Sequence, residues 1–494
     1  MQKTKKKVII IGAGTAGLVI ANQLQDNFDV IVYEKSKYES YPWYYKVPLM
    51  IGLVFRKKVM RHITKREFIL SNGRVIPFFE SNLLGGASVM NGCVHVFGFK
   101  SKWESVLERF NLSYDELLKS NDKAYSYDKN EKSKTTLMHA PQNIIDNAFI
   151  ETLNMKNIKN GDVSYSESEV CGVIQNTVRN FFRTSVLSLI KKKNFISCMQ
   201  EKVESIIFDD SGKAKGVRTD RGEKEADYVI LSAGVIGSND LMLREKNKNN
   251  FFRDIPVGKI IQDHTNIRVN VLANKEIDSL NEIYESFFKK LALVVKHFTG
   301  KPTVMRGTGA TSAAYLDLDK DGEIDTRIQI LQFAESGRHC SDGKMFGSDE
   351  PSFSISINAI HPESYGYIKL NGDTNIVDPN FLSASKDIDI LKLALDYCFE
   401  LLKSEPIKEH VLEIIDEEII KKDPEKYIRD TMFSGHHLIG GLHNAVDSDF
   451  KVKNTEGLYV CDASIFDRYV ASNIHSSVVL IADLFAKKFI RKNF

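Results

Sequence analysis

A glycine pattern directly after the first apolar segment constrains the fold more than any other feature of the chain. Val8–Ile11 is apolar and short enough to be a buried strand, and residues 12–17 read GAGTAG. A helical pattern continues through Leu24, and Val30–Tyr33 is apolar again. A strand, a helix and a second strand within about thirty residues predict a βαβ unit that binds a nucleotide.

Each glycine of this segment has its own role in that prediction. Gly12 allows the tight turn, Gly14 lets the backbone approach a pyrophosphate, and Gly17 lets the helix pack closely on the strand. The helix begins at Thr15 and Ala16, where backbone N–H groups and a partial positive charge would face the phosphates.

A carboxylate stands where a ribose would be bound. Glu34 ends the second strand, 17 residues beyond Gly17, and can accept hydrogen bonds from ribose hydroxyls. An acidic residue there argues against a 2′-phosphate. This motif alone leaves both NAD and FAD open.

The remaining chain has α/β patterns at both ends and a more antiparallel middle. Strand patterns occur at 203–208, 216–218, 228–231, 266–273, 327–333, 353–357 and 457–460, and helical patterns at 103–110, 144–153, 388–402 and 476–489. The alternation in 353–357 predicts a strand with one buried face. We therefore predict an α/β fold: a Rossmann-like nucleotide-binding domain with a second, sheet-rich α+β substrate domain. The first would comprise residues 1–265, completed by 432–494, and the second residues 266–431.

A second glycine-rich stretch gives a more specific signal. Residues 84–98 read LGGASVMNGCVHVFG. This stretch resembles the signature of the glucose-methanol-choline (GMC) oxidoreductase family, which lies beside the flavin. Further segments resemble the family in the same order: RTS at 183–185, residues 203–234, VGKIIQDH at 257–264, PESYG at 362–366, HLIGG at 437–441 and LYVCDAS at 458–464.

The resemblance implies an FAD enzyme and indicates which residues hold the cofactor. Beyond the first motif these are Gly85, Gly86, Ser88, Asn91, Gly92, Val203, Ala233, Asp462 and Ala463. Small residues are needed where the backbone passes the isoalloxazine ring. Some members attach FAD through a histidine just before the signature Asn, where this chain has Met90, so we expect noncovalent FAD. The match at 234–246 is only partial.

The resemblance also selects a catalytic pair. Removing a hydride from an alcohol carbon requires a base for the hydroxyl proton, and a neutral imidazole suits that task. Of two adjacent histidines, the family pattern selects His437, with His436 as its rival on the opposite face of an extended segment. The second position, ten residues before Asp483, is Asn473, which can bond the substrate oxygen; His475 is the alternative.

The predicted activity is oxidation of a small-molecule alcohol, with oxygen, a quinone or a redox protein taking the electrons. A lyase on the same FAD scaffold is the main alternative, since some relatives perform no net redox chemistry. A non-catalytic flavoprotein and an NAD-dependent dehydrogenase are further alternatives. The identity of the alcohol stays open.

Composition adds expectations about partners. The 67 Lys and Arg nearly balance 65 Asp and Glu, which gives no reason to expect nucleic acid or a membrane surface as partner. We find no apolar run of about 18 residues that would predict a membrane span and no secretory signal, and we expect a cytoplasmic enzyme. The cysteines are too dispersed for a zinc site or a disulfide framework: Cys93, Cys171, Cys198, Cys340, Cys398 and Cys461.

One acidic segment resembles the start of a calcium loop. Residues 317–322 read DLDKDG, but the twelfth position of such a loop requires Glu and this chain has Ile328. We predict a solvated hairpin turn there and no metal site.

Overall fold

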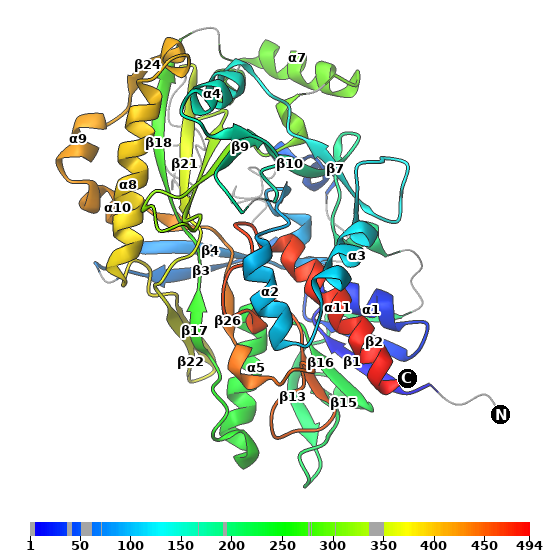
Figure 1. Cartoon of the computed structure of the whole chain (residues 1–494). Coiled ribbons are helices and arrows are strands. Elements are labelled where there is room, and N and C mark those ends of the chain that lie inside the picture. The colour runs from blue at the N-terminus through cyan, green and yellow to red at the C-terminus, as the bar shows by residue number, and fades with distance from the viewer. Residues whose placement is uncertain are drawn as a thin grey trace.

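The computed structural model describes residues 5–36, 42–50, 62–70, 72–165, 167–190, 195–274, 277, 279–301, 303–334 and 350–494. Cys340 lies outside these ranges. Within them the strands form six sheets, and Figure 1 shows the largest at the upper left and the parallel nucleotide-type sheet at the lower right. The thiols of Cys93, Cys171, Cys398 and Cys461 are free and buried.

The GAGTAG segment directly follows β1, a strand of a parallel sheet, as predicted. The strands run, in sheet order, β12 (Ile196–Met199), β2 (Asp29–Glu34), β1 (Lys7–Ile11), β16 (Tyr228–Leu231) and β27 (Leu458–Val460). All the pairings are parallel. The apolar run Val8–Ile11 is almost completely buried, as a central parallel strand must be. Helix α1 (Thr15–Leu24) packs beside α11 (His475–Asn493) on this sheet (Figure 1).

An eight-stranded sheet forms the other main layer. Its order is β24 (Val411–Ile414), β18 (Thr265–Ala273), β21 (Ser352–Ala359), β20 (Thr326–Leu331), β19 (Ala310–Leu316), β9 (Val170–Val173) and β8 (Lys159–Asn160), with β25 (Phe433–Ser434) paired to β18. Helix α8 (Ser385–Leu402) covers one face, where Phe353, Ile355 and Ile357 join the core. Every residue of β21 is buried, so the prediction of a half-buried strand at 353–357 is wrong. The polar face of β21 is buried too, because it faces the interior of the molecule.

Smaller sheets connect these layers. One sheet contains β13 (Val203–Phe208), β14 (Ala214–Thr219) and β15 (Gly222–Glu225), and another contains β23 (Thr374–Asp378), β22 (Gly366–Asn371), β17 (Lys259–Gln262) and β26 (Ile439–Gly441). A third pairs β3 (Ile63–Ile69) with β4 (Val75–Ser81). The fourth contains β11 (Phe182–Arg183), β10 (Gln175–Arg179), β7 (Thr135–His139) and β6 (Tyr125–Ser126), with β5 (Val94–His95) paired to β10. The remaining α-helices are α2 (Lys100–Arg109), α3 (Tyr114–Ala124), α4 (Ile144–Met155), α5 (Gly234–Lys248), α6 (Leu280–Glu285), α7 (Phe287–Phe298), α9 (Glu417–Lys422) and α10 (Pro424–Thr431).

The sheets cross the predicted domain boundaries. Strands β8 and β9, from the segment 1–265, join the eight-stranded sheet, as does β25 from the segment 432–494. The division at residues 265 and 431 stays a prediction.

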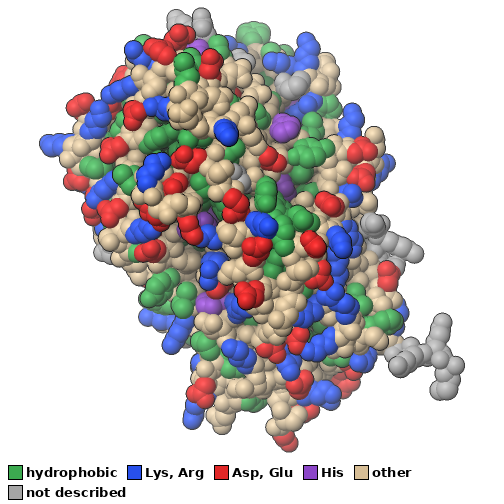
Figure 2. Space-filling model, viewed as in Figure 1, with side chains coloured by type: hydrophobic (Ala, Val, Ile, Leu, Met, Phe, Trp, Pro, Cys, Tyr) green, Lys and Arg blue, Asp and Glu red, His purple; other side chains and the backbone are tan. Residues whose placement is uncertain are grey.

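The surface agrees with the balanced charge of the sequence. Acidic and basic side chains are interspersed over the face shown in Figure 2. Among the described residues, no helix combines the length and apolar character needed to cross a bilayer.

Candidate functional site

The first glycine loop joins β1 to α1 and leaves room for an anion. A Cβ on Gly12, whose φ is +105°, would lie 2.4 Å from the Ser232 carbonyl oxygen, and one on Gly17 would lie 1.9 Å from the Gly12 oxygen. A Cβ on Gly14 would meet no atom within 4 Å. Helix α1 has no side-chain cap and no acidic residue in its first turn, which leaves the N–H groups of Thr15 and Ala16 available to a phosphate. This geometry fits the pyrophosphate of a dinucleotide.

Glu34 closes this loop from the end of β2. One carboxylate oxygen accepts the Ala13 N–H at 2.8 Å and the other accepts the Ser36 N–H at 2.8 Å. A carboxylate oxygen can accept more than one hydrogen bond, so these contacts leave capacity for ribose hydroxyls.

The second glycine segment packs directly on the first. The Gly85 N–H donates to the Ala13 carbonyl at 2.9 Å, and a Cβ on Gly86 would lie 2.9 Å from the Gly14 Cα. The Ser88 hydroxyl is buried and donates to the Gly85 carbonyl at 2.7 Å, so this side chain shapes the loop. The two segments thus form one backbone-walled cradle.

Asn91 and Gly92 are fixed by side chains from distant segments. Arg183 Nη1 donates to both the backbone oxygen and Oδ1 of Asn91, each at 2.6 Å. The Thr308 hydroxyl donates to the Gly92 carbonyl at 3.1 Å. The segment is therefore held in place on both sides.

The ends of the other parallel strands complete the cradle. Asp462, buried after β27, accepts the Gly234 N–H at 2.9 Å and the Ser238 hydroxyl at 2.6 Å, and burial raises the pKa of this carboxyl. Ala463 follows it, and Ala233 caps α5 after β16. Val203 begins β13. Because carboxyl ends of parallel strands meet at one edge, Gly12, Glu34, Ala233 and Asp462 lie along the same edge.

His437 lies between the two main layers in a dense hydrogen-bond network. Its Nε2 is 3.0 Å from Asn473 Nδ2, and its Nδ1 is 3.0 Å from His264 Nδ1. Its backbone N–H donates to buried Asp263 at 2.8 Å. Burial raises the pKa of Asp263 to about 7. The structure thus brings the predicted pair His437 and Asn473 together.

The network determines which nitrogen of each neutral imidazole carries a proton. His264 Nε2 is 3.0 Å from the Ile360 carbonyl, which only accepts, so His264 Nδ1 is the acceptor for an N–H on His437 Nδ1. From the other side, Arg327 Nη1 donates to Asn473 Oδ1 at 2.8 Å, which orients the amide N–H₂ toward His437. The contacts at the two ring nitrogens therefore place the proton of neutral His437 on Nδ1 and its lone pair on Nε2.

The His436 ring makes different contacts from the His437 ring, although the His436 backbone N–H donates at 2.9 Å to the Ser434 hydroxyl, which donates to Asp263. Its ring stacks on Phe78 and Phe79, with centroid distances of 5.1 and 5.8 Å. The expected extended segment is wrong at this position, because His436 has a φ of +59°. This left-handed backbone conformation at His436 directs its ring and the His437 ring to different surroundings.

His475 is the first residue of α11, two residues beyond Asn473. Burial, together with the nearby Arg183 charge, lowers its pKa to about 4. The 3.0 Å contact with His437 Nε2 comes from Asn473. The N-terminus of α11 carries no acidic residue in its first turn, so its partial charge favours negative charge nearby.

Sequence reasoning missed two members of this network. His264 ends the segment VGKIIQDH that resembles the family, but nothing in that segment indicates its role. Arg327 lies in a predicted strand 146 residues before its partner Asn473, and nothing local singled it out. Only the pairing of β20 into the large sheet brings its guanidinium to the site.

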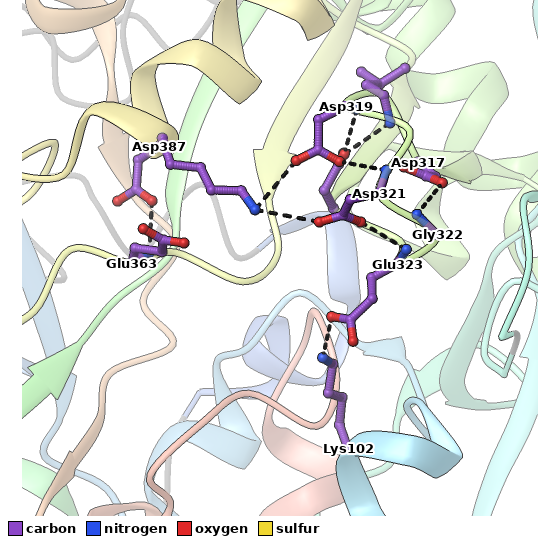
Figure 3. A network of polar contacts seen from close by, with 11 residues as sticks. Lys102, Asp317, Asp319, Asp321, Gly322, Glu323, Glu363 and Asp387 are labelled. Atoms are coloured by element: carbon purple, nitrogen blue, oxygen red, sulfur yellow. Dashed lines mark hydrogen bonds and ion pairs between the residues drawn. The ribbon is translucent and has the colours of Figure 1, made fainter.

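The acidic segment at 317–322 connects β19 to β20, as predicted for a hairpin turn. Asp317, Asp319 and Asp325 place carboxylate oxygens within 4.8 Å of one another. The Lys386 ammonium pairs with Asp319 and Asp321 at 3.3 and 3.4 Å. Figure 3 shows Asp317, Asp319 and Asp321 together on this turn. The absence of a metal there stays a prediction.

A buried histidine near the cradle should make stability depend on pH. His95 is 5% exposed. Burial lowers its pKa to about 3, and the electrostatic effect of nearby His475 acts in the same direction. The unfolded chain therefore binds more protons than the folded one between about pH 3 and the ordinary value near 6.5, and this contribution to stability falls as pH falls through that window.

We expect His95→Phe, which keeps a ring against Tyr125 at 4.4 Å, to remove that contribution. The difference in free energy of unfolding, variant minus wild type, should rise by about 2 kcal/mol between pH 7 and pH 4.5. Chemical unfolding at both pH values measures it. A difference that does not change with pH would contradict a neutral, buried His95.

Comparison with known proteins gives a consistent family assignment. Two family models described as GMC oxidoreductase match residues 6–266 and 362–482. The chain is 23% identical to the alcohol dehydrogenase [acceptor] of Pseudomonas putida, over 98% of this chain and 95% of that protein. It is also 23% identical to the oxygen-dependent choline dehydrogenase of Staphylococcus saprophyticus, over 96% and 93%.

Solved structures with the same fold cover almost the whole chain. A structure concerned with FAD modification in the formate oxidase of Aspergillus oryzae has a TM-score of 0.85 at 18% identity and covers 99% of both chains. A fungal aryl-alcohol oxidase has a TM-score of 0.73 at 14% identity, again over 99% of both. The Rossmann-like α/β fold is thus confirmed, and FAD is the cofactor these comparisons imply.

Proposed function

Because the chain belongs to the GMC oxidoreductase family, we propose that it oxidises a small-molecule alcohol with FAD, using His437 as the base. One observation carries this proposal: the basic lone pair on His437 Nε2 and the Asn473 amide N–H₂ face each other at 3.0 Å. An alcohol oxygen that inserts between them can donate its proton to Nε2 and accept a bond from Nδ2.

When bound, FAD supplies an acceptor at N5 for the hydride that leaves the alcohol carbon. The chain supplies the acid–base part. His437 takes the hydroxyl proton, and the alcohol, having lost a proton and a hydride, leaves as the carbonyl compound. Asn473 holds the oxygen while negative charge develops on it, and the N-terminus of α11 adds a favourable partial charge.

We propose that the cofactor is held noncovalently. The two glycine segments and Glu34 supply backbone and carboxylate contacts for its phosphates and ribose. Met90, which follows the helical turn 86–89, has no nucleophile for a bond to the flavin ring. Release of FAD on acid precipitation, measured in the supernatant, tests this; flavin that stays with the pellet would contradict it.

Anaerobic addition of alcohols to the yellow holoenzyme tests the activity. An oxidoreductase should bleach the flavin absorbance and yield the carbonyl product, whereas a lyase would turn over with the flavin still oxidised. Admitting oxygen, a quinone or a redox protein afterwards and following reoxidation identifies the electron acceptor.

The proton on His437 Nδ1 needs its acceptor on His264. His264 is completely buried and stacks on Tyr469 with a centroid distance of 3.7 Å, so His264→Phe keeps the packing and removes the acceptor. An unsatisfied buried N–H costs about 1–3 kcal/mol, and we expect flavin reduction to slow about 10- to 100-fold with a changed pH profile. Stopped-flow absorbance measures the rate.

His264→Gln, whose side-chain oxygen can accept the same bond, should recover part of the loss. Unchanged FAD content in both variants excludes a folding defect. A wild-type rate in His264→Phe would show that His264 does not select the tautomer.

A further inference from the structure

One face of the large sheet is polar yet buried, and it faces the proposed catalytic pair. Across β18, β21, β20 and β19 the register aligns Asn266, Asn358, Arg327 and Tyr315 in one row. Directly opposite residues of antiparallel strands share a face. Arg327 bonds Asn473, and the Tyr315 hydroxyl bonds Ser472 at 2.6 Å, so this face meets the segment that ends in the catalytic amide.

Several groups on this face have hydrogen-bonding capacity that the protein does not use. Gln329 Oε1 and Asn358 Oδ1 are buried acceptors without partners in the described part of the chain. The Asn358 amide N–H₂ donates to the Thr265 carbonyl at 3.3 Å, which fixes the orientation of Oδ1. Buried acceptors without partners are costly, and only a group that donates a hydrogen bond, such as a hydroxyl or a water molecule, would remove that cost.

The charge on this face is positive. Strands β18, β19, β20 and β21 contain no Asp or Glu, whereas Arg268 and Arg327 both lie on the polar face. Arg327 is 5% exposed, and burial lowers its pKa, which reports an environment unfavourable to the charge. Within the described residues no carboxylate pairs with it.

The guanidinium of Arg327 uses only part of its donor set. Nη1 bonds Asn473, whereas Nε is buried without a partner, and Nη2 makes no hydrogen bond to the described residues. Nε and Nη2 form the edge of the guanidinium that binds a carboxylate through two parallel hydrogen bonds.

We propose that Arg327 binds a carboxylate of the substrate, so that the alcohol oxidised at His437 is a short hydroxycarboxylate. The inference rests on the proposed function and adds the substrate class to it. A single amide, that of Asn473, separates Arg327 from His437, with contacts of 2.8 and 3.0 Å. The hydroxyl and the carboxylate must therefore be close together in the molecule, as in a 2- or 3-hydroxy acid.

Matched substrates on the holoenzyme test the proposal. Glycolate is compared with ethylene glycol, and 3-hydroxypropanoate with 1,3-propanediol, by the second-order rate of anaerobic flavin reduction. Loss of one partner of a buried charged pair costs several kcal/mol, so the acid should be preferred about 100-fold and Arg327→Met should remove that preference. Acetate, which carries no hydroxyl, should bind the wild-type holoenzyme in calorimetry and fail to bind Arg327→Met.

Two further variants separate recognition from packing. Arg327→Lys keeps the charge but loses the planar edge that makes two parallel hydrogen bonds, and it should retain part of the preference for acids over diols. Arg109→Met removes another partly buried guanidinium, which bonds the Ile465 carbonyl away from this face, and should leave the preference unchanged.

Four outcomes are decisive. An equal loss for acids and diols in Arg327→Met would show that Arg327 only positions Asn473, and would overturn the proposal. Equal wild-type rates without acetate binding would overturn it while leaving alcohol oxidation intact. If other alcohols reduce the flavin but these acids do not, the substrate class is overturned and the proposed function stands. If no alcohol reduces the flavin, the proposed function fails, and acetate binding that depends on Arg327 would still support an anion site.

Discussion

Replacing His437 by Gln is expected to slow flavin reduction by about 10²–10⁴-fold, the usual contribution of a positioned general base. The substitution removes the lone pair on Nε2 while keeping a polar side chain beside Asn473 and His264. The rate is measured by anaerobic stopped-flow absorbance across a pH range. The variant should lose the rise in rate that accompanies deprotonation of the base in the wild type.

The matched control is His436→Gln, one residue away. The His436 ring stacks on Phe78 and Phe79, so this change should slow flavin reduction far less. Both variants should keep the FAD content of the wild type. A larger loss in His436→Gln than in His437→Gln would reverse the assignment of the base.

Two alanine substitutions in the first glycine loop should separate folding from cofactor binding. A Cβ on Gly17 would lie 1.9 Å from the Gly12 oxygen and 3.3 Å from Ile10 Cγ2, so α1 must move away from β1. We expect Gly17→Ala to lose FAD and to lower the free energy of unfolding by about 1–3 kcal/mol, as overpacking does. Thermal unfolding and the flavin-to-protein absorbance ratio report the two effects.

Gly14→Ala provides the comparison. Gly14 has an ordinary φ of −83° and open space at its Cβ, so the apoprotein should unfold at the wild-type temperature. The methyl group would occupy the space that the pyrophosphate approaches, and FAD affinity should fall at least about 10-fold, or 1.4 kcal/mol. Wild-type affinity in Gly14→Ala would place the phosphates elsewhere.

Local patterns predicted those parts of the site whose residues are close in sequence. The βαβ unit from Val8 to Glu34 is such a case, because one strand, one loop and one helix contain all of its glycines. Arg327 shows the limit of such patterns: its strand was predicted, but its contact with Asn473 depends on how β20 pairs with β21 and β19. Alternation in 353–357 marked a polar face correctly, yet it could not show that this face is buried.

The sequence by itself determined the nucleotide fold, the family, and the candidates His437 and Asn473, since these depend on short motifs whose geometry is local. The tertiary structure decided which nitrogen of His437 keeps its lone pair, because His264, Ile360 and Arg327 reach it from three separate segments. It also decided that the polar face of the large sheet is enclosed. Burial and proton placement depend on contacts between distant parts of the chain, and local patterns do not contain that information.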